Sequence, residues 1–172
     1  MNVVDILKTY LDRPTDTQQD FDEIAHQVPA EALGGGIADA FRSDRTPDFG
    51  QMAASLFGGS NGEQRAGLLG QLIKSVGPAL LTSVAGGALG RVLQGRAGAD
   101  DGAPATGRFS ETDAAQLSPD QVREIATEAQ RQDPGVLDRV GAFYAQHPEV
   151  VKVLGGAALA IALGQVANRM KR

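Results

Sequence analysis

The sequence predicts an all-α protein, a bundle of about eight or nine mostly short helices. Apolar residues recur at helical spacing through most of the chain, and no useful run alternates apolar and polar residues as a strand would. Prolines repeatedly follow a cap residue, as in Ser118-Pro119 and Asp133-Pro134, which is typical of helix starts. Aromatic residues make up only 5% of the 172 residues and Trp is absent, so the core must consist mainly of Ala, Val, Leu and Ile.

Short amphipathic helices are expected along the N-terminal half, the first over residues 2–13. Pro29 begins a later helix, and the glycine run 34–36 is expected to interrupt or bend it. Thr46 precedes Pro47 as the cap of the next helix. The remaining apolar faces in this half comprise Phe21, Ile24, Ala25 and Val28, then Phe49, Met52, Ala53, Leu56 and Phe57, then Leu68, Leu69, Leu72, Ile73 and Val76.

Two Gly/Ala-rich helices, at about 75–93 and 149–170, are expected to act as core or packing elements, because the runs 75–90 and 153–168 carry no charge. Each has small residues four positions apart, which form a stripe that allows another helix backbone to approach closely. A glycine inside a helix costs about 1 kcal/mol relative to Ala, so we expect close packing to offset this cost. Chance glycines in an Ala/Gly-rich chain are the alternative. The two predicted packing stripes are Thr82, Gly86 and Gly90, and Gly156, Ala160 and Gly164.

Two shorter amphipathic helices are expected ahead of the second uncharged one. Ser118 and Gln121 have the spacing of a capping box, in which each side chain bonds the other residue's backbone N–H. The apolar faces of these helices comprise Val122, Ile125, Ala126 and Ala129, then Val136, Val140, Phe143 and Tyr144. A Gly/Ala/Asp-rich segment without apolar periodicity precedes them and is expected to be a flexible linker. The predicted organisation is an N-terminal helical domain 1–94, a linker 95–117 and a C-terminal three-helix unit 118–172.

The sequence offers no recognisable catalytic, metal or cofactor site. The absence of Cys excludes disulfides, thiol catalysis and cysteine-bound metals, and a net charge of −5 argues against nucleic acid as a partner. His26 lies four residues after Asp22, where ordinary surface pairing is the simplest reading, and His147 stands at a helix junction before Pro148. The glycine-rich residues 58–65 have neither a preceding strand nor a following Lys, so a plain turn is expected rather than a phosphate loop.

These observations favour a non-enzymatic structural or interaction protein, cytoplasmic, that forms a homo-oligomer through its Gly/Ala-rich helices. A membrane-associated protein, peripheral or with 75–90 and 153–168 as a short hydrophobic hairpin, is the alternative. Each run would span less than the roughly 30 Å hydrocarbon core, so a soluble packing helix fits better. A helical small-ligand binder, or an enzyme without a recognisable motif, is the second alternative.

Overall fold

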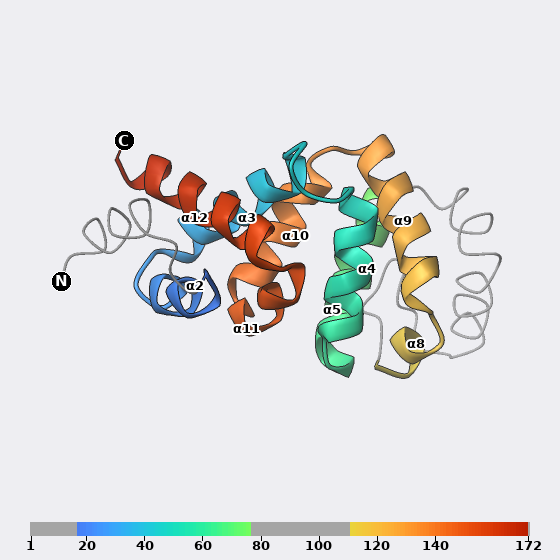
Figure 1. Cartoon of the computed structure of the whole chain (residues 1–172). Helices are drawn as coiled ribbons and strands as arrows, with labels where there is room; N and C mark the ends of the chain where they lie inside the picture. Colours follow the sequence, from blue (N-terminus) through green and yellow to red (C-terminus); the bar gives the residue numbers. More distant parts are fainter. Residues whose placement is uncertain (1–16, 77–110, 172) are drawn as a thin grey trace. The chain divides into compact units, whose positions relative to one another are not determined.

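The computed structural model describes residues 17–76 and 111–171, and every regular element in these two ranges is a helix. The described residues form nine α-helices and one short 3-10 helix, which confirms the predicted all-α fold (Figure 1). The expected helix at 2–13 and nearly all of the one at 75–93 lie outside the described residues. The contacts divide the chain into two compact units, Met1–Asp48 with Leu137–Arg172, and Phe49–Val136.

The first unit brings the beginning and the end of the chain together. Its helices are α2 (Thr17–Ala25), α3 (Ala30–Arg42), α10 (Val136–Ala145), α11 (Pro148–Val151) and α12 (Gly156–Met170). Helix α12 packs against both α3 and α2. The apolar face predicted for α2 is buried, since the side chains of Phe21 and Ile24 are fully enclosed. This face and the inner side of α3 therefore form much of the core that α12 closes.

The glycine run 34–36 does not interrupt α3, which continues from Ala30 to Arg42, so the predicted interruption was wrong. The glycines instead permit close contact with neighbouring helices. A Cβ added at Gly34 would lie 3.0 Å from the Cα of Ala142 in α10, and one at Gly36 would lie 2.6 Å from the carbonyl oxygen of Ala162 in α12. Tertiary packing thus outweighs the weak helix propensity of glycine.

The second unit contains α4 (Phe49–Gly59), α5 (Gly62–Ser75), α8 (Glu111–Ala115) and α9 (Pro119–Gln132). Helix α9 packs on α4 and α5, and α8 packs on α5. The predicted capping box at the start of α9 is present, with Ser118 and Gln121 bonded reciprocally. Thr46 does not cap α4 as predicted, because its hydroxyl donates to the carbonyl of Ala40, 2.6 Å away, at the end of α3.

The predicted linker 95–117 lies mostly outside the described residues, so the predicted domain boundaries stay a prediction. Its last part is helical: α8 includes the buried Ala114, and Leu117 is also buried.

The helix expected over 149–170 is divided into pieces. Helix α11 is followed by the 3-10 helix η2 (Lys152–Leu154), and α12 begins only after Gly155. Gly155 has φ 86° and ψ 167°, a conformation that is accessible essentially only to glycine. The uncharged run therefore changes direction at Gly155, and α12 starts as a separate helix.

Candidate functional site: the two faces of helix α12

The inner face of α12 is apolar and closely packed. It packs closely on Gly36 of α3, where an added Cβ would lie 2.6 Å from Val166 Cγ2 as well as 2.6 Å from the carbonyl oxygen of Ala162. Two helix backbones approach this closely only where one of them lacks a side chain. The glycine here comes from α3 and the small and branched side chains come from α12. The buried residues of α12 are Ala158, Leu159, Ala162, Leu163, Val166 and Ala167.

The opposite side of α12, which we call the outer face, is uncharged and is left partly uncovered by the described residues. Gly156 and Ala157 are exposed, and the other three members are partly exposed. Among the described residues, no atom lies within 4 Å of the position that a Cβ on Gly164 would occupy. The outer face comprises Gly156, Ala157, Ala160, Ile161 and Gly164.

All three predicted packing residues of this helix, Gly156, Ala160 and Gly164, lie on the outer face and not among the residues that α12 buries. The second predicted stripe, Thr82, Gly86 and Gly90, lies outside the described residues. The expectation that either stripe meets another helix stays a prediction.

The close contacts that the sequence did not predict involve other glycines. An added Cβ on Gly141 of α10 would lie 2.5 Å from the carbonyl oxygen of Gly34, and one on Gly50 of α4 would lie 2.8 Å from that of Arg123 in α9. The available signal was the position of Gly34 and Gly36 within an apolar helical pattern that resumes at once with Ile37.

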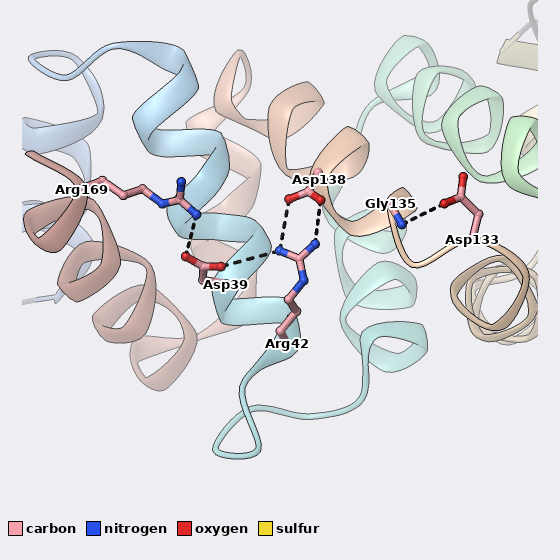
Figure 2. Close-up of polar contacts among 6 residues, drawn as sticks. All are labelled: Asp39, Arg42, Asp133, Gly135, Asp138 and Arg169. Atoms are coloured by element: carbon pink, nitrogen blue, oxygen red, sulfur yellow. Dashed lines mark hydrogen bonds and ion pairs between the residues drawn. The ribbon is translucent and has the colours of Figure 1, made fainter. Parts of the chain in front are cut away.

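Ion pairs join α3 to the C-terminal end of α12 and to α10 (Figure 2). Arg169 donates to Asp39 at 2.9 Å, and its guanidinium carbon is 2.7 Å from where a Cβ on Gly35 would be. Arg42 donates two hydrogen bonds to Asp138, at 3.1 and 2.7 Å, and these bonds raise the pKa of Arg42. Because these side chains are partly exposed, we expect each pair to stabilise the unit by less than about 1 kcal/mol.

A second polar contact holds the segment that precedes α12. Lys152 Nζ donates to the Asp22 carboxylate at 2.8 Å, which joins η2 to α2. His26 Nδ1 donates to the backbone carbonyl of Asp22 at 2.7 Å. The predicted pairing of His26 with Asp22 is thus made through the backbone, and the carboxylate binds Lys152. Both residues have structural partners in the same unit.

Within the described ranges, no group of three or more His, Asp or Glu side chains is placed to hold a metal ion. In the same part of the chain, no helix has the length and apolar character needed to cross a bilayer. Comparisons with protein-family models, with curated proteins and with solved structures find no match for this chain.

Proposed function

We propose that this chain is a non-enzymatic structural or interaction protein of the cytoplasm that associates with a second copy of itself through the outer face of α12. The observation that carries the proposal is that no described atom lies near a Cβ on Gly164, on a helix whose other side is closely packed. A helix from another copy could approach the backbone there without displacing a side chain. The uncharged run 153–168 removes the electrostatic cost of pairing two identical faces.

The size of this face limits the expected affinity. Helix α12 has 15 residues and is therefore about 22 Å long. One face of such a helix buries less than the roughly 1,200–2,000 Å² of a standard stable interface, so a weak association is expected. We expect a dimer that forms at tens of micromolar, with an association free energy of about −6 to −7 kcal/mol.

Light scattering over a concentration series of the full chain, with a Gly164→Leu variant, tests the proposal. No described atom lies within 4 Å of a Cβ at position 164, so we expect the fold to be retained, but the Leu side chain would block the close approach of a second helix. Gly70→Leu in α5 is the matched control, because there too no atom of the described residues lies within 4 Å of a Cβ. Both substitutions gain up to about 1 kcal/mol of helix propensity.

The expected result is association of the wild type and of Gly70→Leu, and a monomeric Gly164→Leu protein. A wild type that stays monomeric at several hundred micromolar would overturn the proposal. So would a Gly164→Leu variant that associates as strongly as the wild type.

A further inference from the structure

The backbone at Gly155 is held in a conformation that other residues rarely adopt, with φ 86° and ψ 167°. No atom of the described residues lies within 4 Å of the position of a Cβ on this residue, so a side chain would be opposed by the backbone conformation and not by crowding from them. Helical residues lie on both sides: the Gly155 N–H donates to the carbonyl of Lys152 at 3.3 Å, and its own carbonyl accepts from Leu159 at 3.2 Å. A change at this one residue would therefore join η2 and α12 into a continuous helix.

Helix α12 is suited to leave and rejoin the unit as one piece. Its apolar inner face packs on α3. If it leaves, that face is exposed along with the surface around Gly36 that it covers. The surface fits this helix closely, since Gly36 leaves room for the Ala162 backbone. The same helix from a second copy would restore every contact.

Val153, two residues before Gly155, provides an independent observation. Its side chain is 46% exposed, and the part of the chain that the structure describes has only one other exposed large hydrophobic residue, Met170. In a pair of chains that exchange α12, the two segments 152–155 would lie close to each other. Each half-exposed Val153 would then gain an apolar neighbour from the other copy.

We propose that residues 152–155 are a hinge through which α12 is exchanged between two copies of this chain, so that α12 of one copy packs on α3 of the other. Gly155 favours the closed form, in which the helix folds back onto its own chain, and the Lys152–Asp22 ion pair holds the hinge in place. This exchange uses the inner face of α12 and does not depend on the proposed association through the outer face.

Cross-linking between two single-cysteine variants tests the exchange, because the natural chain has no cysteine. Asp39→Cys in one copy and Arg169→Cys in another replace an ion-paired couple on α3 and α12 whose side chains are 25% and 46% exposed. The two proteins are incubated together at high concentration, diluted to dissociate weak dimers, and treated with a short bismaleimide. A chain that carries both substitutions is the positive control and should be linked within itself.

The expected result is a linked dimer of the two variants that accumulates with incubation time and persists when Gly164→Leu is added to both. Gly155→Ala should accelerate its formation several-fold, because Ala disfavours the closed hinge, whereas Gly70→Ala should not. Absence of a linked dimer in the natural hinge background, while the doubly substituted chain is linked internally, would overturn the proposal. This outcome can be read even if Gly155→Ala does not fold.

Discussion

Replacement of Gly36 by Ala tests how closely α3 and α12 pack. The added Cβ would lie 2.6 Å from the carbonyl oxygen of Ala162 and 2.6 Å from Val166 Cγ2. The valine methyl can move, but the carbonyl belongs to the backbone of α12. The helix as a whole must therefore shift away from α3, and contacts along its inner face loosen together.

The expected loss follows from two opposing contributions. Overpacking in a well-packed core typically costs about 1–3 kcal/mol, and a backbone obstacle places this site in the upper half of that range. Alanine gains about 1 kcal/mol over glycine in a helix interior. The free energy of unfolding should therefore fall by about 1–2 kcal/mol. For a unit of this size, each kcal/mol lowers the melting temperature by about 4–8 °C.

Tyrosine fluorescence offers an assay specific to the unit concerned. The chain has no Trp and two tyrosines, Tyr10 and Tyr144, of which Tyr144 lies in the first unit. Tyr144 is fully buried, so its emission should change when this unit unfolds. In a Tyr10→Phe background, urea titrations followed at this signal report the stability of the unit that contains Tyr144.

Gly164→Ala is the matched control, because it adds the same methyl group to the same pair of helices. No atom of the described residues lies within 4 Å of its Cβ, so only the propensity gain remains, and the unit should become more stable by up to about 1 kcal/mol. Dilute protein keeps association from contributing. If Gly36→Ala stabilises the unit as Gly164→Ala does, the close contact between α3 and α12 is refuted.

Three further predictions concern the caps, the ion pairs and the last helix. Ser118→Ala removes the hydrogen bond that the Ser118 side chain accepts from the Gln121 N–H, and the free energy of unfolding should fall by about 1 kcal/mol. An unchanged midpoint of urea unfolding would contradict the capping box. Arg42→Lys loses the two-bond contact with Asp138, and the free energy of unfolding should fall by less than about 1 kcal/mol. The difference from the wild type should be smaller at 1 M salt, and a loss that does not depend on salt would contradict an exposed ion pair. Deletion of residues 149–172 should abolish the cooperative unfolding transition seen by tyrosine fluorescence, because the core of the first unit loses the helix that covers α3. A retained transition would show that α12 is peripheral.

The features predicted correctly from the sequence are those that depend on near neighbours along the chain. The all-α class follows from the spacing of apolar residues, and the capping box of α9 closes within four residues, from Ser118 to Gln121. Phe21 and Ile24 are buried as their period indicates. In these cases the partner of each group is a local backbone atom or a helix face, and local spacing determines both.

The features that the sequence did not predict depend on distant partners. Gly36 is a poor helix former by itself, and its place in the continuous α3 is explained only by Ala162, far along the chain. Thr46 had the position of a cap for α4, but its hydroxyl bonds back to Ala40. The residues near Gly155 in the sequence do not indicate whether this glycine is helical or has a φ of 86°. The deciding interactions are tertiary, and their partners cannot be assigned from one sequence.

The glycines of this chain show that a close helix contact can be predicted correctly while its position is not. A small-residue stripe predicts that backbones can approach, and α12 does have a closely packed neighbour. The glycine at that contact is Gly36 of α3, while Gly164 lies on the outer face. The cost of a helical glycine is therefore offset at Gly36 by packing within the chain. At Gly164 the described residues provide no such packing, and in the proposed self-association a second copy of the chain would provide it. The opposite signs expected for Gly36→Ala and Gly164→Ala, together with the loss of association expected for Gly164→Leu, follow from this difference.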